Sequence, residues 1–201
     1  MLKKSLIAAS ICLATTSAVA STNNYYIGVG VNGGSGTQTR TYSSGGEYET
    51  EYDASSANIK FGFLLNSGNR FEINIDSITA DRTGGNTFFA NTNSSDVDSE
   101  YVGYNFDYLI MFNGENKLKP YMDLGLGVYN NDEITGYNTS TGEAETATGL
   151  ALNLGLGLTY SITSNIEVES AYKFKAISWN LDDPDTSEEI SSIYVGVNFK
   201  F

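Results

Sequence analysis

Hydrophobic and polar residues alternate one for one along most of the chain from residue 25 onward. This is the period of a β-strand, whose successive side chains point to opposite faces. The clearest example is 192–201, where Ile, Val and Phe alternate with Ser, Tyr, Gly, Asn and Lys. In 150–162 leucine alternates with Ala, Asn, Gly and Thr. Helical periodicity is absent, so the pattern predicts an all-β protein.

The alternation divides into eight segments joined by connections of two kinds. The predicted strands are 25–32, 58–65, 70–79, 102–112, 118–129, 150–162, 166–176 and 192–201. Tight turns rich in Gly, Asn and Ser occupy 66–69, 113–117 and 163–165. Long polar loops occupy 33–56, 81–99, 130–148 and 180–189. Short turns at one end and long loops at the other predict an eight-stranded antiparallel up-and-down barrel.

The sizes of the side chains indicate which face of the sheet points outward. A soluble calyx would hold the apolar face inside, but so many Leu, Ile, Phe and Tyr side chains do not fit an eight-stranded lumen. The other face carries many glycines, which suit a crowded interior. We therefore expect a transmembrane barrel with its apolar face toward lipid, short periplasmic turns and long extracellular loops.

Within a strand, odd-numbered and even-numbered residues point to opposite faces, and we call this strand parity. Strand parity places twelve charged residues inside this barrel and none on the apolar face. The six basic and six acidic lumen residues are Lys60, Arg70, Lys119, Lys173, Lys175, Lys200, Glu72, Asp76, Asp107, Asp123, Glu167 and Glu169. Buried charges are tolerated when they are paired and hydrogen-bonded. The balance predicts a salt-bridge network that plugs the lumen rather than an ion-selective ring.

Two segments carry a family resemblance. The terminal YVGVNFKF of 194–201 and LKPYMDLGLG of 118–127 resemble the small eight-stranded outer-membrane barrels of Gram-negative bacteria that include the OmpA transmembrane domain and OmpX. The resemblance implies integral outer-membrane location and recognition by the barrel-assembly machinery, which reads a terminal aromatic residue and the alternating residues before it. The residues that would carry this signal are Tyr194, Val197, Phe199 and Phe201.

Composition narrows the chemistry that we expect. The chain has no histidine, which excludes Ser-His-Asp and Cys-His catalysis and histidine metal sites. The enzymatic relatives of the family depend on a histidine, so neither their lipid A acyl transfer nor their proteolysis is carried over. A net charge of −13, from 24 acidic and 11 basic residues, argues against nucleic-acid binding. We expect no cofactor and no enzyme activity.

The first 20 residues have the features of a secretory signal peptide. Lys3 and Lys4 precede an apolar run at 6–13, and Ala18 and Ala20 supply the small residues for cleavage before Ser21. The single cysteine of the chain lies within this segment. The remaining residues, 21–201, are predicted to form one barrel domain without disulfides.

Acidic residues gather in the predicted loops. Oxygen ligands for a weak divalent-cation site could come from Asp182, Asp183, Asp185, Glu188 and Glu189, and a second group is Asp132, Glu133, Glu143 and Glu145. Their spacing matches no known calcium loop, and the plainer interpretation is a solvated acidic surface. Phe88 and Phe89 form an apolar pair in the second loop that either contacts a partner or packs on other loops.

Aromatic residues near the strand ends predict two interfacial girdles. The short-turn girdle would contain Tyr25, Phe112, Tyr160, Phe199 and Phe201, and the loop-side girdle would contain Tyr101, Tyr129 and Trp179.

These features favour a structural and surface-interaction protein, adhesin-like, with a self-plugged lumen and acidic extracellular loops. The alternative is a small pore or transport protein, which would need a continuous water path through the lumen charges. A soluble ligand-binding barrel is a third interpretation. Expected partners are outer-membrane lipid, lipopolysaccharide approached through shared divalent ions, the assembly machinery, and an extracellular ligand or host surface.

Overall fold

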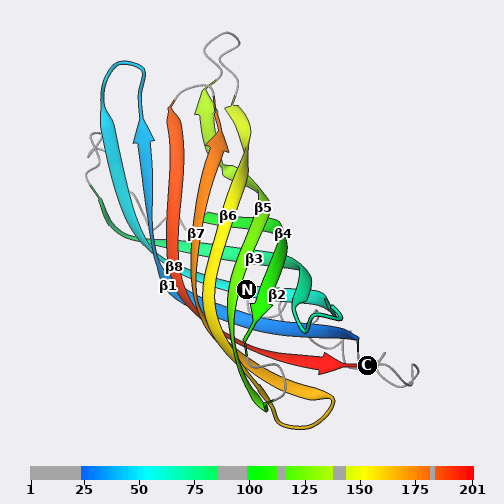
Figure 1. Cartoon of the computed structure of the whole chain (residues 1–201). Helices are drawn as coiled ribbons and strands as arrows, with labels where there is room; N and C mark the ends of the chain where they lie inside the picture. The colour runs from blue at the N-terminus through cyan, green and yellow to red at the C-terminus, as the bar shows by residue number, and fades with distance from the viewer. Residues whose placement is uncertain (1–23, 86–98, 113–115, 138–143, 182–183) are drawn as a thin grey trace.

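The eight predicted strands form one closed antiparallel barrel, in which neighbours in the chain are neighbours in the sheet (Figure 1). The computed structural model describes residues 24–85, 99–112, 116–137, 144–181 and 184–201, with backbone alone at 82–85, 132–137 and 144–146. The strands are β1 Tyr25–Thr41, β2 Glu47–Leu64, β3 Arg70–Gly85, β4 Ser99–Met111, β5 Leu118–Tyr137, β6 Ala144–Ser161, β7 Ile166–Asn180 and β8 Asp185–Lys200. The barrel closes where β1 pairs with β8, from Tyr26 opposite Lys200 to Thr41 opposite Asp185. In the described part of the chain, no helix is long and apolar enough to cross a membrane.

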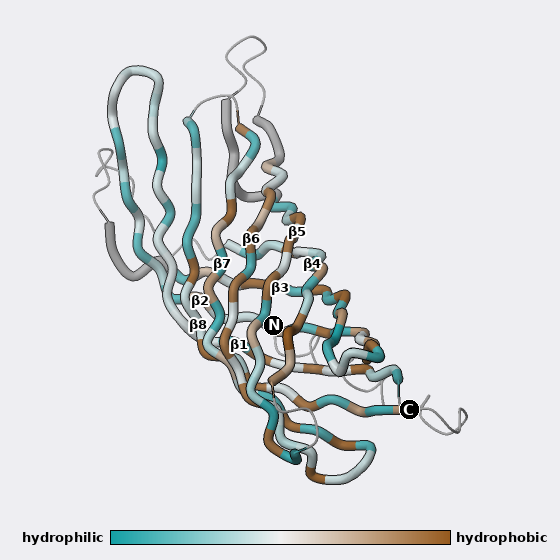
Figure 2. Tube along the Cα trace, in the orientation of Figure 1, coloured by the Kyte–Doolittle hydropathy of each residue, from teal (hydrophilic) through white to brown (hydrophobic). Residues whose placement is uncertain are grey.

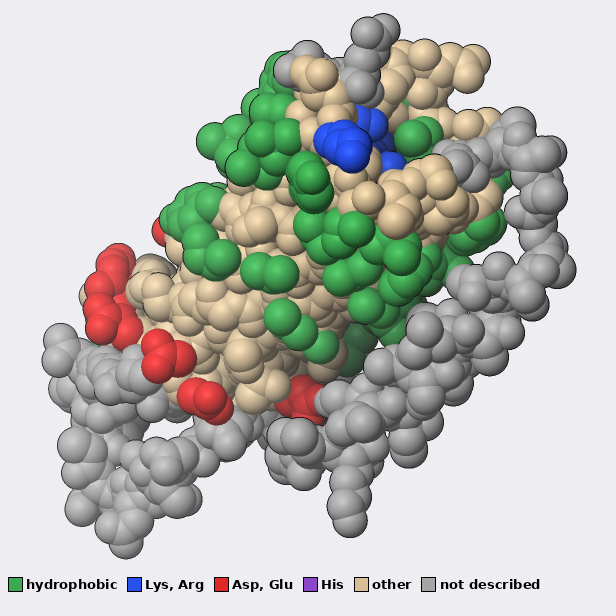
Figure 3. Space-filling model, turned by 90° about the horizontal axis from the view of Figure 1, so that it is seen from below, with side chains coloured by type: hydrophobic (Ala, Val, Ile, Leu, Met, Phe, Trp, Pro, Cys, Tyr) green, Lys and Arg blue, Asp and Glu red, His purple; other side chains and the backbone are tan. Residues whose placement is uncertain are grey.

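The alternating pattern separates an apolar exterior from a polar interior, as predicted. Leu126, Leu150 and Leu156 are each about two-thirds exposed on the outside of the barrel. Apolar positions recur along the lower strands, whereas the far end of the β1–β2 hairpin is hydrophilic (Figure 2). Seen from below, Lys and Arg side chains form one group among hydrophobic side chains, and Asp and Glu side chains lie apart at another edge (Figure 3). We call the outward-facing apolar residues the apolar belt; on β8 it begins at Ile193 and ends at Phe199.

The strands extend further than the sequence pattern predicted. The predicted loop 33–56 is mostly strand: β1 continues to Thr41, β2 begins at Glu47, and a short turn with Gly45 at φ +91° joins them. The predicted loop 180–189 also shortens, because β8 already begins at Asp185. Beyond the apolar belt the outer face meets water and is polar, so the alternation of apolar outer and polar inner residues ends while the backbone pairing continues. The predicted signal segment, with Ala18, Ala20 and Ser21, lies outside the described residues.

Glycines of the lumen make room for tyrosine rings of the neighbouring strand. Four pairs lie directly across from one another: Tyr26 and Gly62, Tyr52 and Gly36, Tyr129 and Gly103, Tyr121 and Gly157. A Cβ atom at any of these glycines would lie 2.0–2.3 Å from a ring carbon. The tyrosines therefore fill the lumen by occupying the space that these glycines leave.

One of the two predicted aromatic girdles is wrong. Tyr25, Phe112 and Tyr160 are exposed on the outside near the short turns, as expected. Tyr101, Tyr129 and Trp179, predicted to lie at the loop-side lipid interface, are instead buried inside the barrel. Their odd positions in β4, β5 and β7 have lumen parity, and parity determines the face on which a strand residue lies.

Candidate functional site

Charged residues fill the lumen in layers, and the layer nearest the short turns is centred on Glu167. Arg70 donates to both carboxylate oxygens of Glu167, from Nη1 to Oε1 and from Nη2 to Oε2 at 3.0 Å. Lys200 Nζ lies 2.6 Å from Oε2, and Ser161 donates to the same oxygen at 3.3 Å. One buried carboxylate is therefore shared by two cations from other strands.

The next layer is centred on the ammonium group of Lys60. Its Nζ lies 3.0 Å from Glu72 and 2.5 Å from Glu169. Tyr121 and Asn198 donate to Glu169 at 2.5 and 2.9 Å, and Tyr26 donates to Glu72. This layer has one excess negative charge and the Glu167 layer has one excess positive charge, so the two layers offset each other.

The third layer joins three aspartates, two lysines and several amides. Lys175 Nζ lies 2.5 Å from Asp76, and Lys173 Nζ lies 3.1 Å from Asp123. Asp107 is held by the side-chain amides of Asn74 and Asn153 and, among the described residues, forms no ion pair.

Ten of the twelve predicted lumen charges thus form ion pairs in the structure, and Asp107 and Lys119 do not. Lys119 lies half-buried near the short-turn end of β5, and no ion pair joins it to the described residues.

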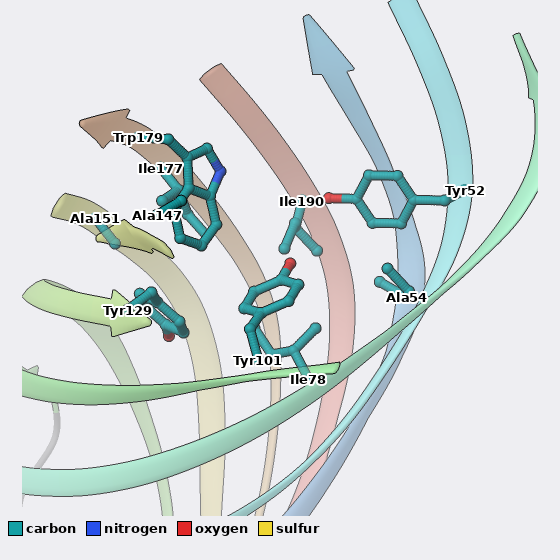
Figure 4. Packing of buried hydrophobic residues seen from close by; sticks show 11 residues of the cluster. Tyr52, Ala54, Ile78, Tyr101, Tyr129, Ala147, Ala151, Ile177, Trp179 and Ile190 are labelled. Carbon is teal, nitrogen blue, oxygen red and sulfur yellow. The ribbon is translucent and has the colours of Figure 1, made fainter. Parts of the chain in front are cut away.

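Glu188 is a thirteenth lumen charge, and its predicted place in a solvated loop is wrong because β8 begins at Asp185. It lies on β8 and is 2% exposed. Trp179 Nε1 donates to it at 2.9 Å, Tyr101 donates at 2.9 Å, and Tyr52 also donates. The three aromatic residues belong to a cluster with Ala54, Ile78, Ala80, Tyr129, Ala147, Ala151, Ile177 and Ile190, most of which Figure 4 shows. We call it the aromatic cluster; it fills the loop end of the lumen.

We expect Glu188→Gln to change how stability depends on pH. Glu188 lies beyond the apolar belt, and burial raises its pKa above the ordinary value of 4.5, partly opposed by its three hydrogen-bond donors. The folded state therefore holds the proton more tightly than the unfolded state. This contribution to stability is complete below the ordinary pKa and is lost as pH rises through the raised pKa.

Urea unfolding between pH 4 and 8 tests this expectation. Relative to wild type, Glu188→Gln should gain stability as pH rises, because the amide accepts hydrogen bonds without carrying a buried charge. Glu189→Gln, at the exposed neighbouring position, is the matched control and should follow the wild-type curve. Parallel wild-type and Glu188→Gln curves would contradict the assignment.

The described residues of the predicted divalent-cation site do not share one face of β8. Asp185 and Glu189 are exposed on the outer face, whereas Glu188 points into the lumen. Among the described residues no three Asp, Glu, Cys or His side chains converge as metal ligands. Asp182, Asp183, Glu143, Phe88 and Phe89 lie outside the described residues, and the side chains of Asp132, Glu133 and Glu145 are not described.

Carboxylates line the outer face of three adjacent strands beyond the apolar belt. On β2 they are Glu47, Glu49, Glu51 and Asp53, and on β8 they are Asp185 and Glu189. The threonines of β1 lie between them: Thr41 pairs with Glu47 and Asp185, and Thr37 pairs with Glu51 and Glu189. Among the described side chains, the outward positions of this face carry no Lys or Arg. We call these six carboxylates and the threonines between them the acidic wall.

The predicted assembly-signal residues lie on both faces of β8. Tyr194 is buried in the lumen, and Val197 and Phe199 lie half-buried on the outer face. Phe201 donates its backbone N–H to Tyr25 at 2.9 Å and stacks on its ring. The terminal aromatic residue therefore helps to join the two ends of the barrel. Its role in assembly stays a prediction.

The family model of the outer membrane protein beta-barrel domain matches residues 5–201. The chain belongs to this family. Together with the closed barrel and its apolar exterior, membership shows an integral protein of the outer membrane.

Three solved structures are similar to the chain. Neisserial surface protein A (NspA) has a TM-score of 0.56 at 17% identity, covering 91% of this chain and 100% of that chain. OprG from Pseudomonas aeruginosa has a TM-score of 0.47 at 15% identity, covering 89% and 96%. Ail, the attachment invasion locus protein of Yersinia pestis, has a TM-score of 0.38 at 14% identity, covering 88% and 99%. None of the curated proteins matches the chain. At 17% identity the likeness to NspA shows the fold alone.

Proposed function

We propose that this outer-membrane barrel is a surface-interaction protein whose acidic wall binds a cationic macromolecular surface, such as a lysine- or arginine-rich segment of another protein. The observation that carries the proposal is the acidic wall itself. Its carboxylates stand on paired strands that continue the barrel rather than on free loops, so the scaffold holds them in place.

The spacing of the acidic wall suits an extended basic chain. Glu47, Glu49 and Glu51 follow one another at every second residue, about 7 Å apart along β2. Asp185 and Glu189 repeat the charge two strands away, with the threonine hydroxyls as hydrogen-bonding groups between them. We propose no catalytic activity, because these carboxylates form rows instead of converging on one point.

Binding of a lysine-rich peptide to the refolded barrel tests the proposal. The triple variant Glu47→Gln, Glu49→Gln and Glu51→Gln should weaken binding about tenfold at 0.15 M salt, because each exposed charge pair contributes about 0.2–1 kcal/mol. Wild-type binding should also weaken as salt rises.

The matched control replaces the neutral threonines between the carboxylates. Thr37→Ser, Thr39→Ser and Thr41→Ser alter the same face without changing its charge or removing its hydroxyl groups and should leave affinity within about twofold, since neutral rim contacts contribute little to binding. Equal affinity of wild type and the glutamine variant would overturn the proposal.

A further inference from the structure

A cavity lies inside the barrel where the third ionic layer meets the aromatic cluster. Its lining includes Asp76 and Asp107 of that layer and Ile78 and Ile190 of the cluster. The centres of water-sized molecules can occupy a volume of about 40 Å³ inside it. One water needs roughly 10–15 Å³ by this measure. Lys173 and Lys175 also line it, and their side chains are 20% and 16% exposed.

The cavity has an excess of oxygen acceptors. Four lining residues each carry a buried side-chain oxygen that accepts no hydrogen bond from the described residues, namely Asn32, Asn58, Asp76 and Asn153. The last three are more than nine-tenths buried. The amide nitrogen of Asn153 already donates to Asn105 and Asp107, at 2.8 and 3.2 Å, so turning the amide over would break both bonds. A buried acceptor without a donor is costly, and such groups call for a ligand.

The third ionic layer, whose Asp76, Asp107, Lys173 and Lys175 line the cavity, lacks one positive charge. Asp76 is paired with Lys175, and Asp123 is paired with Lys173. Asp107, which is 1% exposed, has only amide partners among the described residues. The layer thus contains three carboxylates, of which Asp123 lies outside the cavity lining, and two ammonium groups. With a proton on Asp107 the oxygens of Asn58, Asp76 and Asn153 would still need donors from water, whereas one cation meets the charge and the oxygens together.

We propose that this cavity binds one small monovalent cation of the alkali type, coordinated by the side-chain oxygens of Asn58, Asp76 and Asn153 and balanced by Asp107. Hard cations prefer such an all-oxygen set. A divalent ion fits less well, because a single negative charge is uncompensated and two ammonium groups line the same cavity. The proposal does not depend on the acidic wall, which lies on the outer face.

Urea unfolding of the refolded barrel in phosphatidylcholine vesicles tests the site with Na⁺ as the probe. NaCl is exchanged for N-methylglucamine chloride at constant ionic strength. Binding to the folded state lowers the equilibrium constant for unfolding by a factor of 1 + [Na⁺]/Kd, which is about 11-fold at ten times Kd. Asn58→Leu should abolish this dependence, and Asn180→Leu, at an exposed outward position, should retain it.

Asn58→Asp keeps an oxygen at the site and adds a negative charge, so it should bind Na⁺ more tightly. This variant also provides a test if Asn58→Leu fails to fold. A wild type indifferent to Na⁺ would overturn the proposal, as would equal dependence in Asn58→Leu or unchanged Na⁺ affinity in Asn58→Asp. A larger effect from CaCl₂ at the same ionic strength would overturn the monovalent assignment.

Discussion

Replacing Glu167 with glutamine should lower the free energy of unfolding by about 3–5 kcal/mol, the largest effect that we expect from a single charge. Glu167 is fully buried, and Arg70 and Lys200 both depend on it for their ion pairs. Without its charge, two buried cations lie together in the lumen with no carboxylate within salt-bridge distance in the described residues. The measurement is urea unfolding in lipid vesicles, together with the heat-dependent shift of the folded band in SDS gels.

Two variants separate this network effect from a general effect of lost charge. Glu47→Gln removes an exposed carboxylate of the acidic wall and should change stability by no more than about 0.5 kcal/mol. Lys200→Met leaves Glu167 paired with Arg70, so it should destabilise less than Glu167→Gln. If Glu167→Gln unfolds at the same urea concentration as Glu47→Gln, the buried network contributes nothing to stability.

Which residues enter the lumen could be predicted from the sequence, but their partners could not. Parity alone assigned all twelve predicted charges to the interior, because side chains alternate strictly between faces. The pairs themselves span the barrel: Arg70 on β3 meets Glu167 on β7, and Lys60 on β2 meets Glu169 on β7. Such contacts depend on strand tilt and stagger, which no local pattern records.

Glu188 shows where the sequence pattern ends. The prediction identified each strand by its apolar outer face, and beyond the apolar belt the outer face is polar. Strand parity assigned Tyr194 to the lumen. If β8 had been predicted to begin earlier, the same alternation counted back from Ile193 would have assigned Glu188 to the lumen as well. Threonine, favoured in strands, was a further sign in the β1 segment 37–41 that the strand continues. The glycines were expected to suit a crowded lumen, but their cross-strand pairing with tyrosines required the register.

Trp179→Ala should also destabilise the barrel strongly, by about 3–5 kcal/mol, because it removes a large buried side chain and leaves a cavity. It also takes one of the three hydrogen-bond donors from Glu188. Trp179→Phe keeps most of the volume and loses only the N–H donor, so it should cost about 1–3 kcal/mol. The difference between the two variants measures how much the aromatic cluster stabilises the barrel by packing.

The conductance of Trp179→Ala tests whether the aromatic cluster closes a pore or only stabilises the barrel. In a planar bilayer, folded wild type and folded Trp179→Ala should both carry no steady current, because the Lys60 and Glu167 layers remain in series with the opened cluster. The charged side chains of these two layers are buried and paired. A continuous water path would therefore form only if ion pairs broke and aromatic rings moved. Steady current proportional to salt from Trp179→Ala alone would make the cluster the main barrier. Steady current from wild type would favour the small-pore function over a plugged barrel that serves to display the acidic wall.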